Sequence, residues 1–251
     1  VPLVPVPDRP GRAHLPPYEL MDQLSLLEQG TMTLVGQVID SSNATFLVEL
    51  AQGGQNGFGI YKPQRGERPL WDFEPGLYRR ERAAYLLSQH LGWPLVPPTA
   101  IRADAPLGVG SVQWYVEADQ REHYFSIVKD HPETHDALRM ICLFDLLANN
   151  TDRKSGHVLY GADQRVYGID QGLCFAAQDK LRTVIWDFAG EPIAPALLAA
   201  VEPLAATVPA AVAELLSEDE TEAVRRRAQW LLQRPVFPTD TTGYGYPWPL
   251  I

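Results

Sequence analysis

The sequence predicts an α+β fold with two lobes. Three observations support this prediction: short strand-like segments separated by turns fill residues 33–116, one long amphipathic helix interrupts them, and the rest of the chain is mostly helical in character. We therefore expect an N-terminal antiparallel sheet with one helix, followed by a mostly helical C-terminal lobe.

In the N-terminal half, leucines at roughly helical spacing predict a helix over 18–29 that stops at Gly30. The turn residues 40–43 lie between two β-rich runs and predict a hairpin, while residues 64–75 are polar and predict a loop. A helix is expected over 77–91 because its apolar residues share one face and Gly92 follows. Strands are expected at 33–39, 45–50, 59–62, 99–101 and 112–116.

In the C-terminal half, Pro132 suits the first turn of a long helix that ends near Asn149. Two short strands, 158–160 and 166–169, are expected around a turn, and the Ala/Leu-rich stretch 194–232 predicts two or three helices. The expected organisation is an extended lead-in at 1–17, an N-lobe at 18–116, a C-lobe at 117–233 and a Pro/aromatic tail at 234–251.

Composition excludes several classes of function. Hydrophobic residues make up 45% and charged residues 21% of the chain, which is typical of a globular protein. The net charge of −10 argues against binding nucleic acid or docking on an anionic membrane. The two cysteines have no metal-ligand spacing, and no membrane-spanning or signal segment is recognisable, so we expect a cytoplasmic protein without membrane insertion.

Two acidic motifs carry the predicted chemistry. Asp152 opens the polar loop that follows the long helix, His157 comes five residues later, and Asp170-Gln171-Gly172 follows the short strand pair. Phosphoryl transfer needs one carboxylate near the attacking hydroxyl and a second carboxylate, with a neighbouring donor, to hold the metal that bridges the phosphates. The order and spacing of these residues meet both needs.

These motifs resemble those of the phosphatidylinositol 3-/4-kinase-like atypical kinases and, more distantly, the HipA-like kinases, over roughly residues 33–175. The lipid kinases carry Asp-Arg-x-x-x-Asn and then Asp-x-Gly, where this chain has Asp152-Arg153-Lys154-Ser155-Gly156-His157 and Asp170-Gln171-Gly172. It also looks like a family of uncharacterised actinobacterial proteins. The resemblance implies a protein-kinase-like fold that binds ATP between its lobes, with Asp152 as base, Arg153 as a further catalytic residue, and Asp170 and His157 as ligands of Mg²⁺ or Mn²⁺.

The remaining parts of a kinase site have candidates in the N-lobe. Lys62 ends the third strand, where a lysine would bind the α- and β-phosphates, and Glu81 in the next helix would hold that lysine. The phosphate-covering turn would use Ser41, Ser42 and Asn43, and the linker near adenine would use Tyr115, Val116 and Glu117.

Each residue has an ordinary explanation when taken singly. An Asp-Arg pair in a loop, such as Asp152-Arg153, usually forms a surface ion pair, and Asp-x-Gly is a common turn sequence. Lys62 alone would be a strand-end lysine that reaches into solvent, and Glu81 alone a charge on a helix surface among arginines. Their common order along the chain favours the kinase interpretation.

His157 departs from the family pattern, which has asparagine at this position. Asparagine offers the oxygen donor that Mg²⁺ prefers, whereas neutral histidine offers nitrogen, which suits Mn²⁺ or Zn²⁺ better. The main prediction is a kinase that phosphorylates a hydroxyl of a protein or a soluble small molecule. Two alternatives stay open: a catalytically weak nucleotide-binding pseudokinase that acts as a regulatory partner, and an AMP transferase on the same fold.

Overall fold

The structure is a computed structural model of the 251-residue chain, and it describes residues 20–38, 41 and 43–250. The predicted lead-in at 1–17 and Ser42 of the predicted phosphate-covering turn lie outside the described residues. The chain divides into two compact units. Unit 1 consists of residues 1–78 and 97–115, and unit 2 of residues 79–96 and 116–251.

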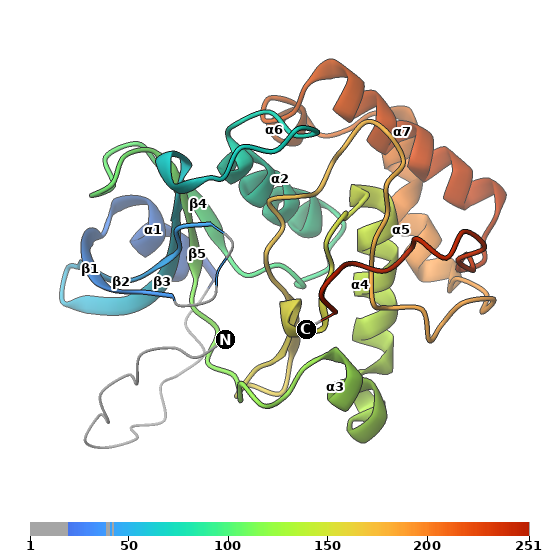
Figure 1. The fold of residues 1–251 in the computed structure, drawn as a ribbon, viewed down its shortest axis with the longest axis horizontal. Helices are drawn as coiled ribbons and strands as arrows, with labels where there is room; N and C mark the ends of the chain where they lie inside the picture. The colour runs from blue at the N-terminus through green and yellow to red at the C-terminus, as the bar shows by residue number, and fades with distance from the viewer. Residues whose placement is uncertain (1–19, 39–40, 42, 251) are drawn as a thin grey trace. The chain divides into compact units, whose positions relative to one another are not determined.

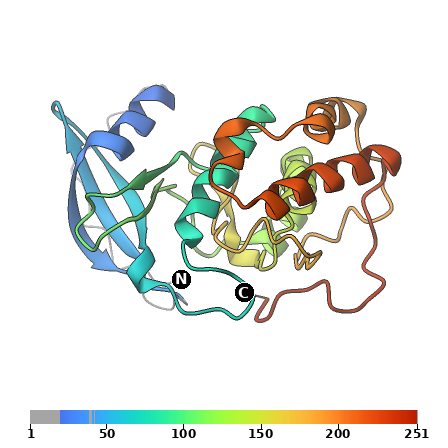
Figure 2. The same ribbon diagram turned by 90° about the horizontal axis from the view of Figure 1, so that it is seen from above.

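Unit 1 is built on an antiparallel sheet with the spatial strand order β1-β2-β3-β5-β4 among the described residues (Figure 1). Gly53 and Gly54, with φ of 56° and 83°, form the tight turn between β2 and β3, because two positive φ angles favour glycine. Helix α1 (Leu20–Gln29) packs along one face of the sheet, as Figure 2 shows. The strands are β1 (Thr31–Gln37), β2 (Phe46–Gln52), β3 (Gln55–Pro63), β4 (Thr99–Arg102) and β5 (Gly110–Trp114).

The core of unit 1 decides which way Lys62 faces. Leu26 and Leu27 of α1 pack with buried residues of the sheet, among them Val48 and Tyr61. Side chains alternate between the two faces along a strand. Because Tyr61 belongs to the core beneath α1, its neighbour Lys62 lies on the opposite face of the sheet.

Unit 2 is mostly helical. Helix α4 buries Leu138, Ile141, Phe144 and Leu147 at intervals of three residues, which forms one apolar face. Helix α7 packs against both α4 and α5. A short hairpin follows α4 in the chain. The helices are α2 (Leu77–His90, which starts in unit 1), α3 (Tyr124–Asp130), α4 (His135–Ala148), α5 (Pro195–Ala206), α6 (Ala210–Ala213) and α7 (Glu218–Gln233), and the hairpin strands are β6 (Val158–Tyr160) and β7 (Val166–Gly168).

Most of the predicted elements are confirmed, with shifts at their ends. The mixed α+β class, the antiparallel sheet, the helix near 77–91 and the hairpin after α4 are present. The long helix predicted from Pro132 was wrong at its start: residues 132–134 form a 3₁₀ turn, and α4 begins at His135.

Helix α3 was not predicted, because it is short and four of its seven residues are aromatic or β-branched, which gives it weak helix propensity. Its formation depends on burial of Tyr124 and Ile127. In the described part of the chain, no helix is both long and apolar enough to span a membrane.

Candidate active site

The loop that carries Asp152 begins where α4 ends. Asn149 has a left-handed backbone, with φ of 48°, and caps the helix. Its side-chain amide donates to the carbonyl oxygens of Ala176 and Gln178, at 2.9 and 2.7 Å, and its Oδ1 accepts from the backbone N–H of Lys180 at 3.0 Å. These bonds attach the start of the loop to the segment that follows Asp170-Gln171-Gly172.

Asp152 is half-buried and has a cation beside it. Its backbone N–H donates to Oδ1 of Asn150 at 3.0 Å, and its Oδ2 lies 3.2 Å from Nζ of Lys154. Burial raises the pKa of the Asp152 carboxyl above its ordinary value, and the Lys154 ammonium partly offsets that increase. The carboxylate is therefore held in place and is a stronger base than an exposed aspartate.

His157 lies between the two acidic motifs. Its Nδ1 is 2.9 Å from the carbonyl oxygen of Asp152, and its Nε2 is 3.4 Å from Oδ2 of Asp170. A carbonyl only accepts, so the first contact requires a proton on Nδ1. The backbone N–H of Lys154 lies farther from the same nitrogen, at 3.4 Å, so the carbonyl contact is the stronger of the two and favours this tautomer. A neutral His157 would then present the lone pair of Nε2 toward Asp170.

Asp170 has a strained backbone, with φ of 57°. Left-handed backbone in a non-glycine residue costs free energy and is concentrated at functional sites. The next residue is held firmly: the backbone N–H of Gln171 donates to Oε2 of Glu81 in α2 at 3.0 Å. Glu81 thus anchors the Asp170 motif within unit 2.

Arg153 is fully buried, although it follows a half-exposed residue. Its guanidinium pairs with the equally buried Asp145 of α4, at 2.9 Å between Nη2 and Oδ1. Nη1 donates to the carbonyl oxygens of His157 and Ile169, and Nη2 donates to Oε1 of Gln171. Arg153 therefore contacts the backbone on both sides of the candidate site and has no exposed surface to offer a substrate.

The predicted nucleotide residues of unit 1 lie in defined positions. Oδ1 of Asn43 accepts from the backbone N–H of Arg68 at 2.9 Å, and Oγ of Ser41 lies 2.9 Å from Oγ1 of Thr45.

The predicted linker residues also have defined contacts. Tyr115 is the last residue of unit 1 before the chain enters unit 2, and its N–H donates to the Phe58 carbonyl oxygen. In unit 2, the carbonyl oxygen of Glu117 accepts from the N–H of Ala162 at 2.8 Å, while Val116 is half-buried.

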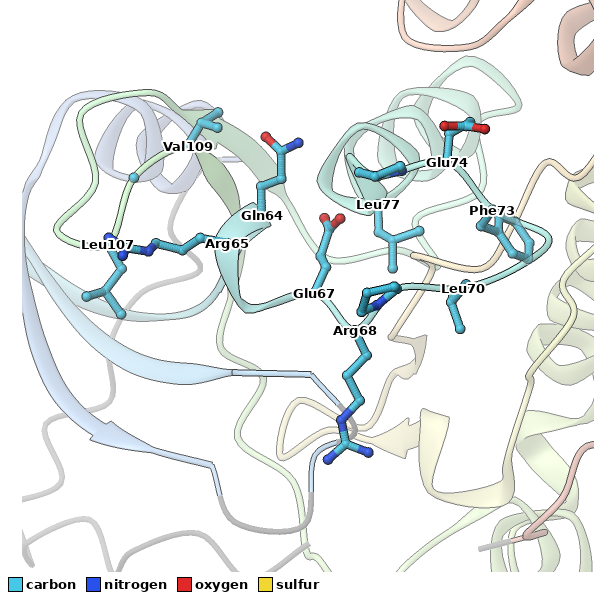
Figure 3. Close-up of a pocket in the computed structure, with 13 residues that line it drawn as sticks. Gln64, Arg65, Glu67, Arg68, Leu70, Phe73, Glu74, Leu77, Leu107 and Val109 are labelled. Atoms are coloured by element: carbon cyan, nitrogen blue, oxygen red, sulfur yellow. The ribbon is translucent and has the colours of Figure 1, made fainter.

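Unit 1 also contains a pocket of about 520 Å³ beyond the end of β3 (Figure 3). Leu70, Phe73 and Leu77 lie on one side of it, and Leu107 with Arg65 lies on the other. None of the predicted nucleotide residues lines this pocket. It is therefore not the site that the acidic motifs predict.

Several residues of the site were not singled out from the sequence. Asp145 lies within a helix, Asn150 is an ordinary loop amide, and Lys154 occupies a position of the first acidic motif to which no role was assigned. Their spacing contained no signal, because their roles depend on contacts with distant residues. Among the described residues, no group of three or more His, Cys, Asp or Glu side chains has the geometry of a metal site.

Two solved structures are similar to this chain in fold. The structure of hydra Fam20 with sugar superposes on the chain with a TM-score of 0.54 at 14% sequence identity, covering 84% of this chain and 86% of that one. The crystal structure of the Helicobacter pylori proinflammatory kinase CtkA gives a TM-score of 0.45 at 11% identity, over 84% of this chain and 94% of that chain. The likeness to Fam20 shows that the fold is kinase-like, as predicted.

No protein-family model matches the chain. It is 40% identical to Protein Rv2133c of Mycobacterium tuberculosis over 265 residues, which covers 91% of this chain and 95% of the relative. The chain belongs to the family of this mycobacterial protein.

Proposed function

We propose that the protein is an ATP-dependent phosphotransferase, an atypical kinase that moves the γ-phosphate of ATP to a hydroxyl group. The observation that supports this best is the direct connection of the two acidic motifs through His157, whose ring contacts the Asp152 carbonyl oxygen and the Asp170 carboxylate. Phosphoryl transfer is achieved mainly by positioning and electrostatic stabilisation, so a kinase-like fold in which one side chain joins the backbone of Asp152 to the carboxylate of Asp170 suits it.

Asp152 is the proposed base. It would orient the acceptor hydroxyl and take its proton as the bond to phosphorus forms. A carboxyl whose pKa is raised by burial is a better proton acceptor than a solvated one. The ammonium of Lys154, 3.2 Å from this carboxylate, favours its ionised form and would add positive charge near the transferred phosphoryl group.

Asp170 and His157 are the proposed ligands of Mg²⁺ or Mn²⁺. Oδ2 and Nε2 face each other at 3.4 Å, and a cation bound between them would interact favourably with both. Two protein ligands are sufficient, because such ions complete their coordination with phosphate oxygens and water. The bound ion would neutralise the charge that develops on the phosphates.

The nucleotide roles remain proposals for unit 1 and the linker. Lys62 would bind the α- and β-phosphates, and the negative charge of Glu81 would hold Lys62. The surrounding groups would be those predicted from the sequence: Ser41, Ser42 and Asn43 for the phosphates, and Tyr115, Val116 and Glu117 for adenine. The acceptor would be a protein or a soluble small molecule in the cytoplasm, and the kinship with phosphatidylinositol 3-/4-kinases remains part of the proposal.

The test is incubation with γ-labelled and α-labelled ATP in the presence of Mg²⁺ or Mn²⁺. Label from the γ-position is expected on the protein or on an added acceptor. Asp152→Asn should reduce the rate by about 10²–10⁴-fold, the usual contribution of a positioned base. The matched control is Asp136→Asn, an exposed aspartate on α4, which should transfer at the wild-type rate. Full activity of Asp152→Asn would exclude the proposed base.

A second candidate is a regulatory nucleotide-binding protein with little turnover. The contact between His157 and Asp170 favours it, because a protonated His157 would occupy the metal ligand without any metal. Thermal stabilisation by ATP without transfer of either label would support this second function. Transfer of the α-label would instead indicate an AMP transferase.

A further inference from the structure

Asp145 is a buried carboxylate that the proposed mechanism does not use. It lies in α4 and is fully buried. Its two oxygens accept hydrogen bonds from three side chains: from Arg153 Nε at 3.2 and 3.0 Å, from Asn150 Nδ2 at 3.1 Å and from Thr183 Oγ1 at 3.3 Å. A carboxylate with this many donors and no exposed surface cannot act on a substrate, so its effect must pass through these partners.

Arg153 transmits that effect to both acidic motifs. Nη1 donates to the carbonyl oxygen of His157 at 3.2 Å and to that of Ile169 at 2.7 Å. Ile169 directly precedes Asp170, and Arg153 directly follows Asp152. One guanidinium, whose orientation is set by Asp145, therefore fixes the backbone on either side of the candidate centre.

The local backbone is shaped to admit this side chain. A Cβ added at Gly168, in β7, would lie 3.3 Å from Nη2 of Arg153 and 3.3 Å from Nε2 of Gln171. This is tighter than ordinary contact. The hairpin that precedes Asp170 thus leaves just enough room for the guanidinium.

A buried ion pair is a poor device for stability. The desolvation of both charges largely cancels their attraction, and apolar replacements of similar size are often neutral or stabilising. Two apolar side chains would fill the same space, but they have no donors for the two carbonyl oxygens that Arg153 binds. The buried pair is therefore weak evidence of a stabilising role, and its contacts with the two carbonyl oxygens point to a different one.

We propose that Asp145 and Arg153 are positioning residues that set the separation of Asp152 from Asp170 and His157. The inference rests on the proposed phosphotransfer function and extends it to a pair of residues that never touch substrate.

The test replaces the pair by apolar residues. Arg153→Met alone should lower the melting temperature, because it leaves the Asp145 carboxylate buried without its cation. The double variant Asp145→Leu/Arg153→Met should melt close to the wild type. Its kcat should nevertheless fall by about a hundredfold, the cost of a small misplacement of reacting groups. Its half-saturating Mn²⁺ concentration should rise, a change that a merely structural role would not produce.

The matched control is Arg139→Met/Glu191→Leu, which removes another ion pair of α4, 2.8 Å apart, on no route to the acidic motifs. It should keep the wild-type kcat and metal dependence. A double variant at Asp145 and Arg153 that melts and transfers phosphate like the wild type would overturn the inference.

Two further measurements keep the outcomes distinct. If the double variant does not fold, Arg153→Lys keeps the charge but lacks the fork that reaches both carbonyl oxygens, and its kcat should fall at least tenfold. A wild-type rate in Arg153→Lys would then overturn the inference. If the wild type itself transfers no phosphate, the proposed function fails. Positioning is then judged by calorimetry of Mn²⁺ binding in the presence of a non-hydrolysable ATP analogue. The affinity for Mn²⁺ should be about tenfold weaker in whichever of the two variants folds, and an affinity equal to that of the wild type would overturn the inference.

Discussion

Replacing Glu81 by alanine separates two roles that this carboxylate is proposed to have. Its Oε2 accepts the backbone N–H of Gln171 at 3.0 Å, and that N–H directly follows the strained Asp170. The sequence also suggested that the charge of Glu81 holds Lys62. The first role needs only an oxygen acceptor, whereas the second needs a negative charge.

The structure sets the size of the effect on stability. Glu81 and Gln171 are both buried, so the substitution leaves the Gln171 N–H without its charged acceptor. A hydrogen bond to a charged group contributes about 1.5–3 kcal/mol to the free energy of unfolding. For a chain of this length each kcal/mol shifts the melting temperature by about 2–4 °C, so Glu81→Ala should melt about 3–12 °C lower.

The assay combines thermal melting with γ-phosphate transfer in Glu81→Ala and Glu81→Gln. The glutamine keeps an oxygen acceptor, so it should recover most of the melting temperature but not the transfer rate. Glu222→Ala is the control, because Glu222 forms a solvent-exposed ion pair with Arg225, and water screens such pairs so that they contribute little to stability. The reasoning is refuted if Glu81→Ala melts no lower than Glu222→Ala, and the charge role is refuted if Glu81→Gln transfers phosphate at the wild-type rate.

Three further outcomes are expected. Lys154→Met removes a charge that lowers the pKa of Asp152, so the carboxyl should stay protonated to a higher pH. The acidic limb of the pH profile of kcat/KM should therefore move to higher pH, and an unmoved limb would contradict the base assignment. His157→Asn replaces a nitrogen ligand by an oxygen ligand and should shift the metal preference from Mn²⁺ toward Mg²⁺ in transfer assays, and an unchanged preference would argue against coordination by His157. Gly110→Ala should lower the free energy of unfolding, measured in urea, by about 1–3 kcal/mol, because the added Cβ would collide with the carbonyl oxygen of Lys62 on β3. A variant as stable as the wild type would show that the two strands move apart easily.

Much of the fold could be predicted because its elements are marked locally. The apolar spacing of α2, the two short strands after the long helix and the run of Ala and Leu after residue 194 are all local signals, and each element is present. Helix α3 could not be predicted, since its seven residues are weak helix formers and burial of Tyr124 stabilises them.

The candidate site shows the same division. Asp152, His157 and Asp170 were identifiable because motif order and spacing are properties of the chain. The sequence by itself therefore determined the fold class and the residues to which chemistry could be assigned. The roles of Asp145 and Glu81 in holding those residues were decided only by the tertiary structure. Arg153 reaches Asp145 eight positions back and Ile169 sixteen positions ahead, and Glu81 meets Gln171 across 90 positions. Burial and hydrogen bonding between such distant residues leave no periodic trace in a sequence, because they arise only when the folded chain removes both partners from water.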